Sequence, residues 1–150
     1  AKSGGYTVPM PLVLGAMAAD GSAETLAVLE EFGDRVGLAF ARRDDLLGIL
    51  GEPAQTGKPQ GEDIRDRKPT VIRALGEAAG LRWPTGDDTD DVQAGRLVDR
   101  LRAAGVITQV EDLIAEQVDA AIALTTHPAI DPDARDGLAA AAELLAWRPA

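Results

Sequence analysis

Residues 22–50 read SAETLAVLEEFGDRVGLAFARRDDLLGIL, and this proline-free stretch decides the fold class. Apolar side chains recur along it at steps of three, four or seven, which is the period of a helix. They are Leu26, Leu29, Phe32, Val36, Phe40 and Leu47. Ser22 can cap the first turn, and Glu24 places a negative charge where the helix dipole favours it. We therefore predict one long helix over this stretch, ended by the Gly-Glu-Pro sequence at 51–53.

The rest of the chain also predicts helices, with no strand alternation or internal repeat. Pro11 to Ala19 is short and almost wholly apolar, which implies a helix buried on most sides. Further helices are expected at 70–79, 91–104, 108 or 109 to 125, and 131–147, and a long loop is expected at 51–69. Asp131 followed by Pro132 is a favoured helix start. We expect an all-α chain with no internal domain boundary.

The composition excludes some function classes. The 150 residues include 15 Lys and Arg against 25 Asp and Glu, and the formal net charge is −10. Nucleic acids and anionic membranes need an extended basic surface, which this balance argues against. No apolar run reaches the roughly 18 residues of a membrane span. The absence of Cys removes disulfides, thiolate metal ligands and a cysteine nucleophile.

The apolar segment at 8–19 has a second interpretation as part of a signal peptide. Lys2 precedes it, and Ala-Met-Ala at 16–18 is similar to a cleavage site. Pro9 and Pro11 interrupt the segment, however, so a buried helix explains it better. We therefore expect a cytoplasmic protein.

A charged segment around the end of the long helix is the candidate functional site. Asp44 and Asp45 lie near the end of the predicted helix, and Thr-Gly-Lys-Pro follows at 56–59. Between 56 and 73, five basic side chains accompany three acidic ones, a local reversal in an acidic chain. Carboxylates bind Mg²⁺, and lysines neutralise phosphate charge, so a Mg²⁺–diphosphate site fits. From these residues alone, a solvated helix end beside a charged loop remains the more economical interpretation.

Several motifs in order carry a family resemblance. They are KSGGYT at 2–7, FGDRVGLAF at 32–40, RDDLLG at 43–48 and TGKP at 56–59, followed by Gly61 and Asp63. This series closely resembles the C-terminal half of the polyprenyl (trans-isoprenyl) diphosphate synthases. Spacings agree over about residues 1–75, and Asp44-Asp45 falls in the second aspartate-rich motif of that family. Residues 76–150 match mainly as a helical continuation.

The resemblance implies the fold and the activity. We expect an isoprenoid-synthase-like helical bundle, of which residues 1–150 form the C-terminal half, without the N-terminal half and its first aspartate-rich motif. The family is one of Mg²⁺-dependent prenyltransferases of isoprenoid biosynthesis, which join an allylic diphosphate to isopentenyl diphosphate, commonly as homodimers. The 150 residues alone are expected to be inactive. A non-catalytic helical subunit or pseudoenzyme of the same family is the alternative.

The resemblance also implies roles for individual residues. Asp44 looks like a ligand of the Mg²⁺ that binds the allylic diphosphate, and Asp45 like its supporting metal-binding carboxylate. Lys58 is similar to a lysine that contacts the same diphosphate. Lys2 resembles the lysine of a Lys-Thr/Ser pair near the diphosphate and the developing cation, with Ser3 alongside. The implied catalytic residues are Lys2, Ser3 and Asp44.

Two departures from the family pattern concern the same region. Gly48 stands at i+4 from Asp44, where a third carboxylate often assists, and its lack of a side chain is expected to weaken metal binding. Ala41 stands where the family commonly has Gln, whose amide dipole faces the reacting carbon. Asp63 and Lys68 fit family positions less directly tied to chemistry.

The remaining polar and aromatic features have structural interpretations. The acidic run at 87–91 fails as a calcium loop, because valines stand where its Gly and bidentate Glu are required. Its carboxylates suit the first turn of a helix instead. His127, the only histidine, is interpreted as a surface loop residue, and Phe32 and Trp147 as core anchors.

Overall fold

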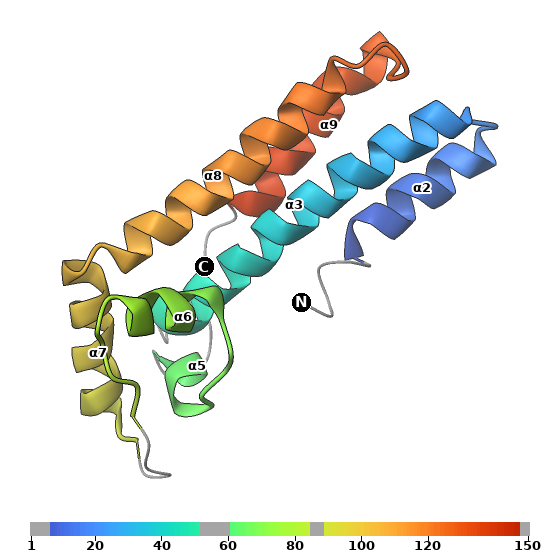
Figure 1. Ribbon diagram of the computed structural model, residues 1–150. Coiled ribbons are helices and arrows are strands. Elements are labelled where there is room, and N and C mark those ends of the chain that lie inside the picture. The colour runs from blue at the N-terminus through green and yellow to red at the C-terminus, as the bar shows by residue number, and fades with distance from the viewer. Residues whose placement is uncertain (1–6, 52–60, 85–88, 148–150) are drawn as a thin grey trace. The chain divides into compact units, whose positions relative to one another are not determined.

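The structure is a computed structural model that describes residues 7–51, 61–84 and 89–147. Its helices are α2 (Pro9–Ala18), α3 (Ala23–Leu50), α5 (Glu62–Arg65), α6 (Val71–Ala78), α7 (Asp91–Ala103), α8 (Val106–Thr125) and α9 (Pro132–Ala146). Figure 1 shows no strand in these ranges, which confirms the all-α prediction. The chain divides into two compact units, the first made of residues 1–41 and 113–149 and the second of residues 42–112. No boundary is evident in the sequence, because the divisions fall inside the continuous helices α3 and α8.

Helix α3 begins and ends as predicted. The Ser22 hydroxyl accepts a hydrogen bond from the Thr25 backbone N–H at 3.1 Å, which caps the first turn. At the other end, the Gly51 N–H donates to the Leu47 carbonyl at 2.8 Å. The last residues of α3, from Arg42 onward, belong to the second unit and carry Asp44 and Asp45.

The core of the first unit is formed where α3, α8 and α9 meet. Phe32 and Val36 of α3 are buried there with Ala121 of α8 and Ala142 of α9. Phe32 is 2% exposed, which confirms it as a core anchor. The same prediction for Trp147 is wrong, because its side chain is 42% exposed. Helix α9 buries small alanines instead, and Trp147 lies beyond its last turn.

Helix α2 lies alongside α3 (Figure 1) and begins two residues earlier than predicted, with Pro9 in its first turn. A Cβ at Gly33 would lie 2.5 Å from the Pro9 Cα, so the two backbones approach closely at this glycine. The prediction that α2 is buried on most sides is wrong for the described structure. Met10, Leu14 and Met17 are about half exposed, because only one face of α2 packs on α3. No helix among the described residues is both long and apolar enough to cross a bilayer.

The second unit contains an element that the sequence did not indicate. Helix α5 lies inside the stretch expected to be a loop, and it begins after Gly61, whose φ is +77°. Helix α6 lies within the predicted range 70–79, and Thr70 caps it, since its hydroxyl accepts from the Arg73 N–H at 3.2 Å. Helix α7 is capped by Asp90, which accepts from the Gln93 N–H at 2.7 Å. Helix α8 begins at Val106, two or three residues before the predicted start at 108 or 109.

The second unit has its own core, to which all of its helices contribute. Its fully buried large side chains are Leu46, Ile49, Ile64, Ile72, Val98, Leu101, Val106 and Val110. The buried tryptophan is Trp83, which is 7% exposed and packs with Leu101 against Gly76. Leu46 and Ile49 anchor the end of α3, and Ile64 anchors α5. The carboxylates on these two helices are therefore attached to a packed framework.

Candidate functional site

Asp44 and Asp45 occupy neighbouring positions near the end of α3, in the second unit. Adjacent residues point about 100° apart around a helix, so the two carboxylates have different surroundings. Asp44 is exposed, whereas the Asp45 side chain is 20% exposed. The buried Leu46 beside them fixes the rotation of the helix about its axis. Asp44 is thus the carboxylate presented to solvent.

Asp45 is joined to α5 through a lysine. The Lys68 Nζ lies 3.1 Å from the Asp45 Oδ1 and 3.0 Å from the Asp63 Oδ2. The backbone holds the same lysine: its N–H donates to the Asp63 carbonyl at 3.1 Å, and its carbonyl accepts from the Thr70 N–H at 2.9 Å. Asp45, Asp63 and Lys68 therefore form one linked group, called the carboxylate clamp below.

The clamp keeps its lysine charged. Partial burial acts to lower the pKa of Lys68, but the hydrogen bonds and charges of Asp63 and Asp45 outweigh it and raise that pKa above its usual value. Lys68 therefore remains an ammonium throughout the neutral range, and it neutralises charge where two carboxylates lie close together.

Gly48 lies directly beneath the Asp63 carboxylate. A Cβ built at Gly48 would overlap the carboxylate oxygens and carbon of Asp63. These atoms are the end of the Asp63 side chain, which is 12% exposed. The glycine thus provides the space in which the clamp forms.

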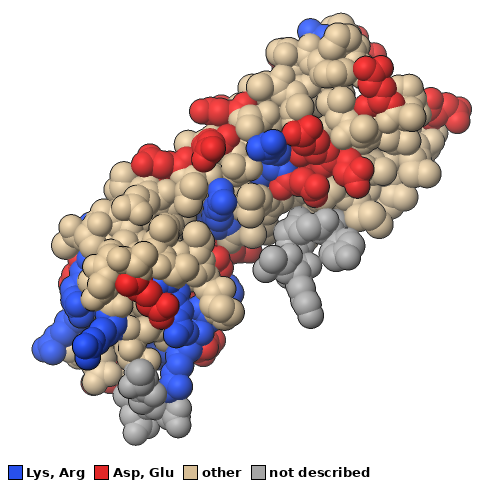
Figure 2. Space-filling view, viewed as in Figure 1, with Lys and Arg blue, Asp and Glu red and all other residues tan. Residues whose placement is uncertain are grey.

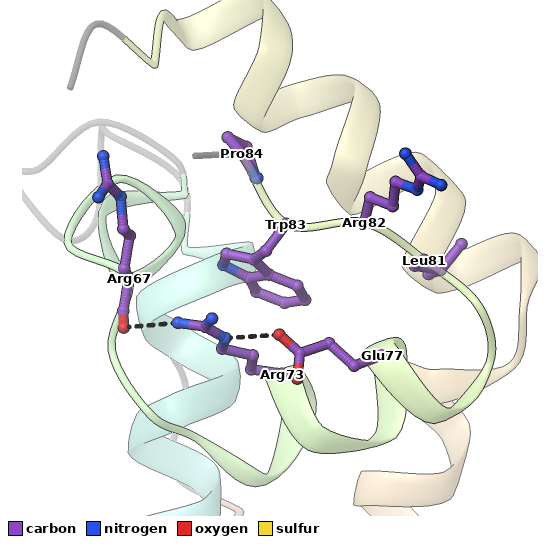
Figure 3. Close-up of a pocket in the computed structure, with 7 residues that line it drawn as sticks. All are labelled: Arg67, Arg73, Glu77, Leu81, Arg82, Trp83 and Pro84. Atoms are coloured by element: carbon purple, nitrogen blue, oxygen red, sulfur yellow. Dashed lines mark hydrogen bonds and ion pairs between the residues drawn. The ribbon is translucent and has the colours of Figure 1, made fainter. Parts of the chain in front are cut away.

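A cavity of about 460 Å³ opens in the second unit (Figure 3). Its lining residues are Arg67, Arg73, Glu77, Leu81, Arg82, Trp83 and Pro84. Arg73 is fixed in its wall: its Nε donates to Glu77 at 2.9 Å, and its guanidinium lies 6.0 Å from the centre of the Trp83 ring. Another guanidinium nitrogen of Arg73 donates to the Arg67 carbonyl at 3.1 Å. The cavity wall therefore holds the backbone immediately before Lys68.

Positive charge is concentrated in the second unit. Most of the chain's 15 Lys and Arg residues fall between residues 42 and 112. On the visible face in Figure 2, the second unit shows Lys and Arg beside acidic residues, whereas the first shows mainly Asp and Glu. Residues 42–112 carry 11 Lys and Arg against 14 Asp and Glu, so the second unit is much closer to neutral than the rest of the chain and repels an anionic ligand less.

The structure brings together only some of the predicted site residues. Asp44 and Asp45 share the end of α3, while Lys2, Ser3 and Lys58 lie outside the described residues. Within the described ranges, no three potential ligands gather into a metal-binding group. The donors present nevertheless suit Mg²⁺, which is commonly held by one or two carboxylates and completed by substrate phosphates and water. Asp44 is the carboxylate best placed for this role.

The structure also describes most of the acidic run at 87–91 and His127, for which structural roles were predicted. In the acidic run, Asp90 caps α7 and Asp91 pairs with Arg65 at 2.8 Å, while residues 87 and 88 lie outside the described ranges. His127 lies in the turn before α9, where its Nδ1 accepts from the Ala129 N–H at 3.2 Å. These contacts agree with the structural interpretations of the acidic run and the histidine.

Sequence reasoning missed the carboxylate clamp. Asp63 and Lys68 were predicted in a loop, where a five-residue separation indicates no contact. The hydrogen bonds of α5 and the turn at residues 66–67 bring the two together. The available signal was the pairing of an acidic residue, Asp63, with a basic residue, Lys68, in one short charged segment.

An all-helical fold with paired aspartates near the end of a long helix is consistent with the prenyl diphosphate synthases that the sequence resembles. Comparison with known families gives the same result: the polyprenyl synthetase family matches residues 1–79. This chain belongs to that family.

Individual relatives support the assignment. A geranylgeranyl diphosphate synthase of Mycobacterium tuberculosis is 36% identical over 130 residues, which cover 80% of this chain and 37% of that protein. A farnesyl diphosphate synthase of the same organism is 45% identical over 73 residues, covering 46% of this chain and 20% of the relative. The chain therefore spans well under half the length of these curated relatives.

A solved structure extends the similarity to nearly the whole chain. It is a geranylgeranyl pyrophosphate synthase of Corynebacterium glutamicum in complex with isoprenyl diphosphate and magnesium. The TM-score is 0.84 at 35% identity, and the match covers 96% of this chain and 43% of that one. Helices beyond the family match, including α8 and α9, thus belong to the same fold.

Proposed function

We propose that this chain is the C-terminal half of a polyprenyl diphosphate synthase. Such an enzyme would join an allylic diphosphate to isopentenyl diphosphate and release inorganic diphosphate, acting as a homodimer. The placement of Asp44 carries the proposal: it is an exposed carboxylate on a rigid helix end, within the part of the chain that matches the family. The length of the relatives supports a partner half of similar size.

The residues have distinct tasks under this proposal. Asp44 would hold Mg²⁺, which when bound would stabilise the negative charge of the departing diphosphate. Lys58 and Lys2 would neutralise the remaining diphosphate charge, and Ser3 would add a hydrogen bond beside Lys2. Asp45 would support Asp44 from within the clamp, because its own carboxylate already contacts Lys68.

The proposal predicts that Mg²⁺ and inorganic diphosphate together stabilise the complete protein against heat. A ligand that binds only the folded state raises the unfolding free energy by mass action, by about 2.7 kcal/mol at a concentration of 100 Kd. Asp44→Ala should lose most of the shift in melting temperature. Differential scanning fluorimetry with and without Mg²⁺ and diphosphate measures it.

Asp34→Ala is the matched control, because Asp34 is another exposed aspartate on α3, within the first unit. It should retain the full shift. Equal shifts in the wild type and Asp44→Ala would exclude Asp44 as the metal ligand.

A further inference from the structure

The cavity of the second unit carries an excess of positive charge. Its described lining includes three arginines and one glutamate, which are Arg67, Arg73, Arg82 and Glu77. Glu77 is paired with Arg73 at 2.9 Å, so the lining keeps a formal excess of two positive charges. The whole chain, by contrast, has a formal net charge of −10. A concave site of opposite sign to the whole chain is suited to an anionic ligand.

Arg73 is held in a fixed orientation at this cavity. Its Nε donates to Glu77 at 2.9 Å, a second nitrogen donates to the Arg67 carbonyl at 3.1 Å, and its guanidinium lies 6.0 Å from the centre of the Trp83 ring. A guanidinium has five N–H donors in one plane, and these two hydrogen bonds engage only two of them. Arg73 therefore presents a preorganised set of donors of the kind that binds carboxylate or phosphate oxygens.

Trp83 contributes a donor that the protein leaves unused. Its indole Nε1 is buried and meets no hydrogen-bond acceptor among the described residues. Figure 3 shows this nitrogen on the side of the ring nearer Arg67, with Arg73 below it. Buried polar groups are nearly always hydrogen-bonded, so an unpaired one at a cavity wall calls for an explanation. An oxygen atom held at this edge by Arg67 and Arg73 would supply the missing acceptor.

The charge and the spacing of the arginines indicate the class of anion. Arg67 and Arg82 stand on opposite sides of Trp83 in Figure 3, so a ligand with two anionic groups can approach both. A diphosphate carries at least two negative charges, matching the excess in the lining, whereas a simple carboxylate carries one. The volume of about 460 Å³ lies within the range of about 300–1,000 Å³ typical of small-ligand sites.

We propose that this cavity is a metal-independent binding site for a diphosphate group. Arg67 and Arg82 neutralise its charge from two sides, Arg73 donates from the wall, and the Trp83 N–H donates to one of its oxygens. None of these residues belongs to the Mg²⁺ site proposed around Asp44, so the inference goes beyond the proposed function. Inorganic diphosphate and the head group of a prenyl diphosphate share the chemistry that this site recognises.

The site is tested by fluorine NMR of the complete protein, labelled with fluorotryptophan and kept free of metal by EDTA. The resonance of Trp83 is the one that the Trp83→Phe variant lacks. Titration with inorganic diphosphate should shift this resonance until the site is saturated, because the anion lies against the edge of the ring. In nitrogen-labelled protein, the proton of the Trp83 indole N–H should move downfield in the same titration. An unmoved indole proton would overturn the hydrogen bond from Trp83.

Variants of the lining should weaken the response. Arg82→Gln should lower the apparent diphosphate affinity about threefold or more, and Arg67→Gln/Arg82→Gln about tenfold or more, as loss of charge-assisted hydrogen bonds does. Arg102→Gln is the matched control, because Arg102 is exposed in the same unit and lies outside the lining. It should keep the wild-type affinity. Wild-type affinity in the folded double variant would overturn the site.

Two further ligands define what the site recognises. Equal affinities for inorganic diphosphate and isopentenyl diphosphate would assign the diphosphate group alone as the ligand, whereas tighter binding of isopentenyl diphosphate would assign the head group of a prenyl chain. Sodium acetate at matched ionic strength should leave the Trp83 resonance in place. An equal shift with acetate, or no shift with diphosphate, would overturn the proposal.

Asp44→Ala separates this site from the proposed function. It should leave the metal-free response of Trp83 unchanged, while losing the thermal stabilisation by Mg²⁺ and diphosphate. Loss of the Trp83 response in a folded Asp44→Ala variant would overturn the independent site. Failure of Mg²⁺ and diphosphate to stabilise the wild type would refute the role of Asp44 without affecting this site.

Discussion

Ala41 lies one turn before Asp45 on α3 and is partly buried. An alanine offers no dipole, so it cannot stabilise a cation that develops nearby. Ala41→Gln should raise kcat of the complete protein about tenfold, which corresponds to about 1.4 kcal/mol of transition-state stabilisation. KM should change little, because an interaction made only in the transition state acts on kcat. Steady-state kinetics with both diphosphates tests this.

Unchanged kcat in a correctly folded Ala41→Gln variant would show that the pocket does not use an amide at this position. Ala41→Asn is a useful companion, because it adds the same amide on a shorter side chain. Only the longer side chain should raise kcat if its reach matters.

At the residue scale, the sequence indicated which residues belong to the candidate site better than it indicated which residues they contact. The order of the motifs was enough to mark Asp44 and Asp45 as neighbours on one helix end. It could not show that Asp45 is bound to Lys68, because that contact depends on the path of the chain through α5. Nor could the sequence show which of the two tryptophans is buried. Trp83 is buried because residues of α6 and α7 pack around it, while Trp147 follows the last turn of α9 and is exposed.

At the element scale, the helices followed from apolar period and capping residues. Ser22, Asp90 and Asp131 all accept the hydrogen bonds expected of caps. Helix α5 was missed because four residues are too few to show a period, and Gly61 and Pro69 beside it suggested a loop. The exposure of α2 was also missed, since an apolar sequence does not reveal what covers each face.

The close approach of α2 to α3 gives an element-scale prediction. Gly33→Ala should destabilise the complete protein by about 1–3 kcal/mol, because the new methyl group meets the Pro9 backbone, which cannot rotate away. Urea unfolding measures the change. Gly15→Ala is the matched control, since a Cβ there meets nothing within 4 Å and Ala favours the helix. Gly33→Ala at full stability would contradict the close packing of α2 on α3.

At the scale of the whole molecule, exposed apolar surface is the main feature. Met10, Leu14 and Met17 present an apolar face of α2 to solvent, and Leu38 of α3 is 43% exposed. Exposed apolar side chains gathered on one helix are typical of a face that another part of a protein covers. A further half of the enzyme, as the length of the relatives supports, would cover it.

The most direct test of the whole account is transfer of labelled isopentenyl diphosphate onto an allylic diphosphate in the presence of Mg²⁺. We expect the complete protein to form a longer polyprenyl diphosphate, and residues 1–150 alone to form none, because under the proposed function Asp44 and Asp45 would provide only part of the metal site. Addition of the N-terminal half to residues 1–150 should restore product formation. Absence of product from the folded, complete protein, or product formation by residues 1–150 alone, would contradict the account.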